Sequence, residues 1–139
     1  MGIARLVKNN LSYIRSDLAG FASAYSLATP TTMLLSHCGV SDEVNVIGTF
    51  VAKSLGFAAG KILTHDNYRL ALTKSNILST GLDAILQMAC HYFVLKSHVL
   101  PVYLSHFASY ALTGSTTTGF RWFLDYRSGV FDIENKADR

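Results

Sequence analysis

The sequence has few charged residues, and those few are unevenly spread. Only 15% of its residues are Asp, Glu, Lys or Arg. None of these stands between Asp17 and Asp42, or between Lys96 and Arg121. Each gap is longer than the roughly 20 residues with which an α-helix crosses the hydrocarbon core of a bilayer. A soluble helix carries charges on its outer face along its whole length, so this distribution argues against a soluble domain.

Cysteine is also scarce, and no catalytic motif is present. Cys38 and Cys90 lie in apolar segments and form no Cys-x-x-Cys unit, so we interpret them as buried structural thiols. Asp83 alone is no acid–base pair, and no Ser, Cys or Thr stands in a base motif, so we expect no enzyme. The net charge of +3 comes without a basic helix face or zinc-finger spacing, so we expect no nucleic-acid partner.

The apolar segments predict an all-α integral membrane protein. Segments 18–41, 44–60, 76–95 and 97–120 hold only two charges, Lys53 and Asp83. We expect one membrane domain over residues 1–139, a four-helix bundle with transmembrane helices at 18–38, 44–63, 76–95 and 99–124. The apolar positions of residues 1–16 recur every three or four residues, which predicts a short interfacial helix. Residues 125–139 would form a tail.

Basic residues gather on one side of these predicted spans. Apart from Lys53 and Lys96, every Lys and Arg lies in the N-terminal segment, the connector after the second helix, or the C-terminal region. Lys and Arg are retained on the cytoplasmic side of membranes. We therefore expect both termini on the cytoplasmic side, or on the matrix or stromal side in an organelle.

Small residues recur at every fourth position on two predicted helices. They are Gly48, Ala52, Gly56 and Gly60 on the second, and Ser105, Ser109, Thr113 and Thr117 on the fourth. Such stripes let helix backbones approach closely in a membrane. They either close the bundle internally or contact other chains. The second alternative predicts a small non-catalytic subunit that packs, among lipids, within a larger membrane protein complex.

A polar face lies on the third predicted helix. Asp83, Gln87 and His91 are spaced by four. Lys53, near the middle of the second helix, lies within side-chain reach of Asp83 at a rise of about 1.5 Å per residue. An unpaired charge in lipid costs several kcal/mol, so the two are predicted to pair. The pair either fixes the helix register or belongs to a proton or substrate relay.

Histidines are the remaining candidates for binding a cofactor. His91 and His106 are predicted at similar depths, so a haem or metal ion between them is an alternative that would make the chain a redox subunit. His37 and His98 lie near the predicted outer surface and are candidates for a metal ion. No two histidines have i, i+3 or i, i+4 spacing, so no cofactor is the first expectation.

The two halves have a similar layout and close on basic-aromatic segments. These are Gly60-Lys61-Ile62-Leu63-Thr64-His65 and Phe120-Arg121-Trp122-Phe123-Leu124-Asp125. The layout resembles the GtrA-like family of four-helix membrane proteins, which close on Asn-Phe-x-x-x-Arg-x-x-x-Phe. Here Gly119 stands at the Asn position, and the spacing from Phe120 to Arg127 is longer. The resemblance implies translocation or presentation of polyprenyl-phosphate-linked sugars, with a lipid-phosphate rim at Lys61, Arg121 and Arg127.

Overall fold

The structure, a computed structural model, describes residues 11–90, 93 and 102–129, except the side chains of Leu70, Val102, Tyr103, Ser105 and His106. Every regular element in these ranges is helical. The helices are α2 (Leu11–His37), α3 (Asp42–Thr64), the short α4 (Tyr68–Ala71), α5 (Lys74–Cys90) and α6 (Val102–Arg127). The prediction of an all-α fold with four long helices is confirmed for these ranges.

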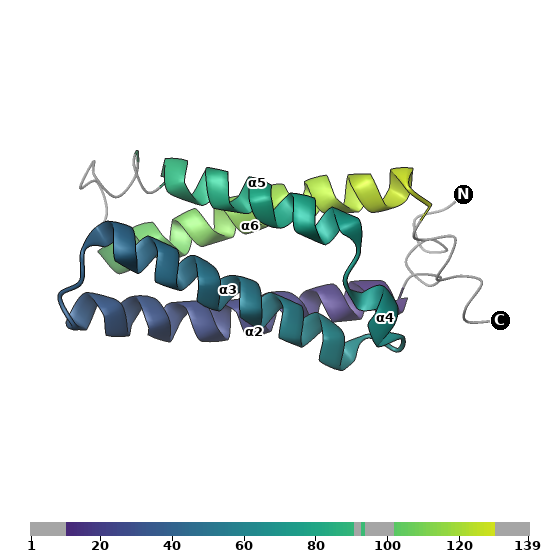
Figure 1. Cartoon of the computed structure of the whole chain (residues 1–139), viewed down its shortest axis with the longest axis horizontal. Coiled ribbons are helices and arrows are strands. Elements are labelled where there is room, and N and C mark those ends of the chain that lie inside the picture. Colours follow the sequence, from purple (N-terminus) through teal and green to yellow (C-terminus); the bar gives the residue numbers. More distant parts are fainter. Residues whose placement is uncertain (1–10, 91–92, 94–101, 130–139) are drawn as a thin grey trace.

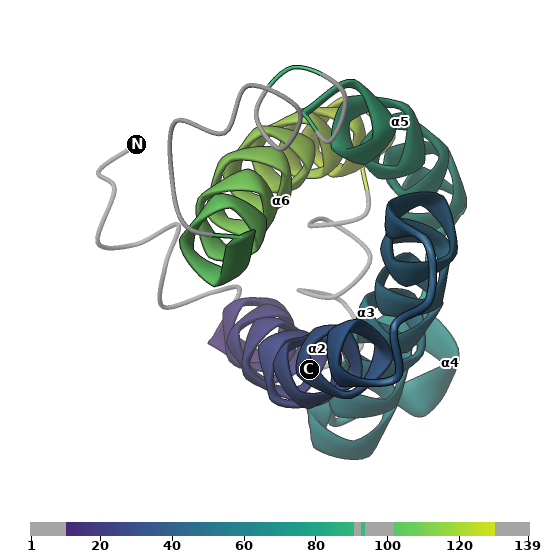
Figure 2. The same cartoon turned by 90° about the vertical axis from the view of Figure 1, so that its left-hand side faces the viewer.

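The four long helices run side by side along the long axis of the molecule (Figure 1). Viewed along that axis, they form a ring in the order α2, α3, α5, α6 (Figure 2). α2 and α5 begin, and α3 and α6 end, beside the short α4. We call this the α4 end. The opposite end, which contains the connection between α2 and α3, we call the turn end.

The turn between α2 and α3 has a clear local cause. Gly39 adopts a positive φ of 69°, which a residue without a Cβ takes at little cost. The Val40 amide then donates to the Leu35 carbonyl over 3.4 Å and closes the end of α2. Ser41 caps α3 by accepting from the Val44 amide, also over 3.4 Å. The first helix was predicted to end just before Gly39, and in the structure it ends at His37 in this glycine turn.

Glycines bring the backbones of α2 and α3 together. A Cβ on Gly60 would lie 2.5 Å from the Ala19 carbonyl oxygen, and one on Gly56 would lie 2.6 Å from that of Ser23. Neither distance is compatible with a side chain, because carbonyl oxygens of a helix cannot move aside. This part of the small-residue stripe therefore packs inside the bundle.

The interior of the bundle is polar, and its exterior is apolar. Among the described residues, no Leu, Ile, Met or Phe is buried, and the buried apolar side chains are Tyr13, Ala24, Ala28, Val46, Ala71 and Tyr110. Hydroxyl, amide and charged side chains occupy most of the other buried positions. Large apolar residues such as Leu55, Ile85 and Leu112 are more than half exposed. Soluble proteins have the opposite distribution.

By length and hydropathy, one described helix is suited to crossing a membrane. This is α3, whose most apolar 18-residue window has a mean hydropathy of 1.4. The prediction of four transmembrane helices is not supported by this measure. Polar residues on the inward faces of α2 and α6 lower their averages, and the described part of α5 has 17 residues. A core helix of a soluble protein passes the same test, so α3 alone does not assign the chain to a membrane.

Three predicted boundaries need correction. α2 begins at Leu11, so residues 11–16 continue the first long helix and do not form the end of a separate interfacial helix. No Gly or Pro interrupts the chain there, and Tyr13 and Asp17 are buried on the same face. α4 was not predicted, and α6 continues past residue 124 to Arg127. The described part does not include residues 1–10, 91–92, 94–101 and 130–139. Most of the predicted interfacial helix, the end of the third predicted helix, the start of the fourth and most of the predicted tail therefore lie outside it.

Candidate functional site

Polar groups, most of them buried, follow one another through the bundle from the α4 end to the turn end. They form three groups, which we call the Asp17 cluster, the central pair and the hydroxyl layer. The Asp17 cluster contains Asp17, Lys61, Arg121 and Trp122. The central pair is Lys53 with Asp83. The hydroxyl layer contains Thr32, Thr49, Tyr110, Asn45 and Ser36.

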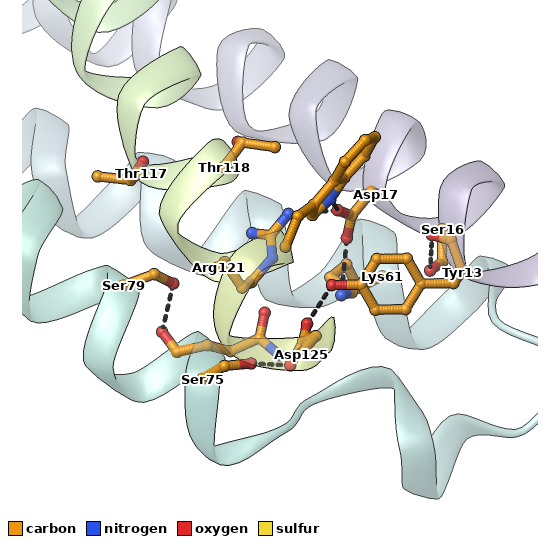
Figure 3. A network of polar contacts seen from close by, with 12 residues as sticks. Tyr13, Ser16, Asp17, Lys61, Ser75, Ser79, Thr117, Thr118, Arg121 and Asp125 are labelled. Atoms are coloured by element: carbon orange, nitrogen blue, oxygen red, sulfur yellow. Dashed lines mark hydrogen bonds and ion pairs between the residues drawn. The ribbon is translucent and has the colours of Figure 1, made fainter. Parts of the chain in front are cut away.

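In the Asp17 cluster, one carboxylate joins three helices. Lys61 Nζ lies 2.7 Å from Asp17 Oδ1, and Arg121 forms an ion pair with Asp17 Oδ2. Figure 3 shows both cations turned toward Asp17. The Trp122 indole N–H donates to the same Oδ2 over 2.6 Å. Asp17, Lys61 and Arg121 are all almost fully buried, so the ion pairs are not screened by solvent.

Aromatic rings cover the two cations of the cluster. Arg121 Cζ lies 4.7 Å from the centre of the Phe57 ring, and Lys61 Nζ lies 4.7 Å from that of Tyr13. A cation over an aromatic face within about 6 Å is stabilised, more so when it is desolvated. The cluster therefore holds one net positive charge in an aromatic shell.

A second buried carboxylate lies beside this cluster. Asp125 accepts hydrogen bonds from the Tyr13 hydroxyl and from Ser75, and from Thr73 over 3.1 Å. Asp125 is fully buried. These hydroxyls come from α2, from the segment before α5, and from α5 itself. Asp125 thus ties α6 to both neighbouring helices, and none of the described cations forms an ion pair with it.

The central pair lies between α3 and α5. Lys53 Nζ is 2.5 Å from Asp83 Oδ2, and the two side chains form an ion pair. Both side chains are about nine-tenths buried. One turn further along α5, the Gln87 side chain is buried, and neither of its amide atoms has a partner in the described part of the chain. The predicted contact between Lys53 and Asp83 has this geometry in the structure.

The hydroxyl layer near the turn end is uncharged. The Thr32 hydroxyl is 2.7 Å from that of Thr49 and 2.9 Å from that of Tyr110. Thr49 lies 3.1 Å from the Asn45 side-chain oxygen, to which it donates. The Asn45 amide in turn donates to Ser36 over 2.7 Å. These bonds connect the interior near Tyr110 with the surface at the turn end.

A cavity of about 60 Å³ lies among the four long helices, next to both the central pair and Arg121. Its polar lining includes Lys53 and Asp83 together with hydroxyl groups from α3, α5 and α6. A cavity of 10–15 Å³ already holds one water molecule if polar groups surround it. The site therefore has room for several water molecules or one small hydrophilic solute.

The hydroxyls of α5 and α6 present oxygen lone pairs to this cavity. Ser79 and Thr80 donate to the Asn76 carbonyl, and Thr117 and Thr118 donate to carbonyls of the preceding turn. A hydroxyl has one hydrogen and two lone pairs. Because each hydrogen is used within its own helix, these four groups act as acceptors toward the cavity. The groups of the lining that can donate are Lys53, Arg121 and the hydroxyls of Tyr25 and Ser54.

The predicted lipid-phosphate rim does not form as expected. Lys61 and Arg121 are buried and held by Asp17, so they are not free at the surface. The physical reason is that α2 begins earlier than predicted and brings a carboxylate to their depth. Only Arg127 is exposed. Lys61 and Arg121, which hold corresponding places in the two closing segments, both form ion pairs with Asp17.

The other residues predicted for helix packing or cofactor binding lie partly in the interior and partly outside the residues that the structure describes. On α6, Ser109, Thr113 and Thr117 are buried and face the interior. On α3, Gly48 faces the Leu35 side chain, and Ala52 is half-buried. Two candidates for haem or metal binding, His91 and His98, and the side chains of Ser105 and His106 lie outside the described residues.

The described residues offer no metal centre of the ordinary kind. His37 is exposed near the turn end. Within residues 11–90, 93 and the described side chains of 102–129, no group of three His, Cys, Asp or Glu side chains lies together. The candidate site therefore consists of the Asp17 cluster, the central pair and the hydroxyl layer, with the cavity among them.

Two central residues were missed from the sequence. The first helix is predicted to begin at residue 18, which leaves Asp17 outside it, and Asp125 is the last residue of the basic-aromatic segment that closes the second half. The signal was present: Tyr13, Asp17, Gly20, Ala24 and Ala28 recur at three or four residues and are all buried. Small and polar residues thus mark the inward face of α2.

Comparisons with protein-family models, curated protein sequences and solved structures found no match to this chain. The likeness to the GtrA-like family accordingly stays a prediction from layout.

Proposed function

We propose that this chain is a multi-pass membrane protein whose four long helices enclose a polar passage for a small hydrophilic species. The observation that carries the proposal is the inverted distribution of side chains, with charges and hydroxyls inside and large apolar residues outside. The cavity beside Lys53, Asp83 and Arg121 supplies the place where such a species would bind.

The inverted distribution supports a membrane because each half of it is costly in water. Large exposed apolar surfaces favour association or lipid contact. Buried charges without an apolar core give little to offset the entropy of folding. In a bilayer, lipid covers the outer residues, and ionisable groups face the bundle interior and pair with one another. Such groups commonly mark the pathways of ions and substrates.

The arrangement of the helices supports the predicted topology. α2 begins and α6 ends at the α4 end, so both would emerge on one side of a membrane. Arg15, Arg69, Lys74 and Arg127 lie in or near this end. By the positive-inside rule the α4 end would face the cytoplasm, or the matrix or stroma. The chain itself would act without catalysis.

The accessory-subunit hypothesis receives less support from the geometry. Its main argument is the small-residue stripes. However, α2 already packs against Gly56 and Gly60, and Thr113 and Thr117 face the interior. The outer surface left for a partner subunit is the same apolar surface that lipid would cover. The GtrA-like alternative needs free cations for a lipid phosphate, and Asp17 occupies two of the three expected.

Labelling of cysteines on the two sides of α3 tests the membrane arrangement. Cys38 is exposed at the turn end, and Asn67 is exposed after α3 at the α4 end. In variant C90A, a membrane-impermeant maleimide should label Cys38 from one side of sealed vesicles. In variant C38A/C90A/N67C, it should label position 67 from the other side. Labelling of both from the same side would refute the proposal.

Passage of a hydrophilic species is tested in proteoliposomes. Vesicles with the wild-type protein should swell in small polar solutes, or change internal pH, faster than vesicles without protein. If position 38 and position 67 label from opposite sides but no solute and no proton passes, the accessory-subunit hypothesis replaces the passage.

A further inference from the structure

Besides Lys53 Nζ, which forms the ion pair with Asp83, two buried polar atoms of the cavity lining lack a hydrogen-bond partner in the part of the chain that the structure describes. They are Asp83 Oδ1 and Arg121 Nε. The first accepts a hydrogen bond and the second donates one. Both residues are more than nine-tenths buried, and a buried polar group without a hydrogen-bond partner destabilises the folded state. A molecule in the cavity that both donates and accepts would satisfy both atoms.

The four lining hydroxyls on α5 and α6 narrow the chemistry of that molecule. They offer only lone pairs toward the cavity, so the molecule must donate hydrogen bonds to them. Water meets these demands, since each molecule donates two hydrogen bonds and rotates freely. With about 60 Å³ available, several water molecules fit.

The charge balance of the interior argues against a permanently charged ligand. The described interior contains three buried cations and three buried carboxylates: Lys53, Lys61, Arg121, Asp17, Asp83 and Asp125. A bound ion would leave one net charge in a low-dielectric interior, at a high cost in free energy. A water molecule adds no charge and can still deliver a proton.

We propose that the cavity is a proton-exchange site at which water delivers protons to Asp83 and Lys53 passes them on. The inference rests on the proposed function and names the species that moves. A cavity water molecule breaks one O–H bond and gives that proton to Asp83 Oδ1, while it takes a replacement proton from the next water molecule outward, so that no ion stays in the cavity. Lys53, no longer facing a carboxylate, breaks one N–H bond and gives that proton to a second water molecule, which passes one of its own protons onward. The Asp83 proton then moves to the Lys53 amine.

Each such cycle moves one proton and restores the carboxylate and the ammonium. The groups that face Asp83 come from every neighbouring helix. Tyr25 on α2, Lys53 on α3 and Arg121 on α6 line the same cavity as Asp83, and Gln87 lies one turn further along its own helix. Lys53 forms an ion pair with Asp83 across 2.5 Å, which is close enough for a proton to pass between the two groups.

Proton flux into proteoliposomes tests the inference. Vesicles with an entrapped pH-sensitive dye receive a pH gradient, with valinomycin and potassium to balance charge. Wild-type protein should equilibrate the pH faster than empty vesicles. Variant D83N should fall to the rate of empty vesicles. Variant D66N is the matched control, because it makes the same chemical change at an exposed carboxylate, and it should keep the wild-type rate.

A second variant guards against misfolding. D83N leaves Lys53 without a counter-charge, so D83N/K53M, which removes both charges, is tested in parallel and should insert more readily. It should also conduct no protons. Wild-type flux in either variant, or D66N losing flux as D83N does, would overturn the exchange site. The exchange site would also be overturned if the wild-type protein showed no proton flux. The labelling of positions 38 and 67 tests the membrane arrangement separately, whatever the result of the flux measurement.

Discussion

At the α4 end of the interior, a single carboxylate, Asp17, holds two buried cations and an indole N–H. At the turn end, hydroxyls and one amide link the same helices without any charge. Both ends are equally free of leucine and phenylalanine cores. The comparison shows two ways to hold a polar interior together, and they differ in what the loss of one member leaves behind. A lost hydroxyl leaves a neutral vacancy, whereas a lost carboxylate leaves unpaired cations.

The largest effect is expected from breaking the charged end. Asp17→Ala leaves Lys61 and Arg121 buried without a counter-charge. The loss should be about 3–5 kcal/mol in the free energy of unfolding. Reversible unfolding in detergent micelles, followed by circular dichroism, measures it. The exposed pair of Asp66 with Arg15 gives the matched control, and Asp66→Ala should change the free energy of unfolding very little. Equal losses in the two variants would contradict the comparison.

The backbone contacts of the two ends should respond differently to one methyl group. In Gly60→Ala the new Cβ meets the Ala19 carbonyl, and in Gly48→Ala it meets Leu35 Cδ1. A carbonyl cannot yield, but the end of a leucine side chain can. Gly60→Ala should therefore cost about 1–3 kcal/mol, and Gly48→Ala distinctly less. The same micelle unfolding experiment compares them, and the reverse order would show that α2 and α3 pack in another register.

A smaller loss is expected from the uncharged end. Thr49→Val keeps the shape of the side chain but removes the hydroxyl between Thr32 and Asn45. Thr32 still bonds Tyr110, so the loss should be about 1 kcal/mol, the net value of a neutral hydrogen bond. Thermal unfolding beside Asp17→Ala measures the difference. If Thr49→Val costs as much as Asp17→Ala, charge is not what distinguishes the ends.

The smallest effect concerns the surface of the α4 end and its pH dependence. Hydrogen bonding from Ser12 and the ion pair with Arg15 hold the pKa of Asp66 below its usual range. A carboxylate with a lowered pKa in the folded state stabilises that state above its unfolded pKa. The contribution is lost as the pH falls through the folded pKa. Wild type and D66N should thus differ slightly in melting temperature at neutral pH and converge below about pH 4. A difference that grows on acidification would contradict this assignment.

Much of the fold could be predicted from apolar runs and helix signals. Gly39 and Ser41 mark the end of one helix and the start of the next, and α3 lies within two residues of its predicted range. The position of a residue along the bundle axis follows from its place in its helix, and on this basis Lys53 was predicted to pair with Asp83. These features depend on one helix at a time or on position along the bundle axis.

The Asp17 cluster could not be predicted in the same way. It depends on which face of α2 turns inward and on which helices lie beside it, and position along the axis does not reveal either. Because α2 was expected to begin at residue 18, Asp17 was not considered as part of its inward face. Lys61 and Arg121 were then assigned to an exposed rim. The inward face of small and polar residues from Tyr13 onward would have corrected this.

Accessibility of the outer helix faces tests the central claim most directly. In a variant without Cys38 and Cys90, single spin labels replace outward residues on each long helix: Leu27, Leu55, Ile85 and Leu112. In lipid vesicles, collisions with oxygen, which concentrates in the bilayer, are compared with those of a water-soluble nickel complex. The account predicts that oxygen dominates at all four positions. Dominance of the nickel complex on α2, α5 and α6, with oxygen dominant on α3 alone, would contradict a four-helix membrane bundle with a polar interior.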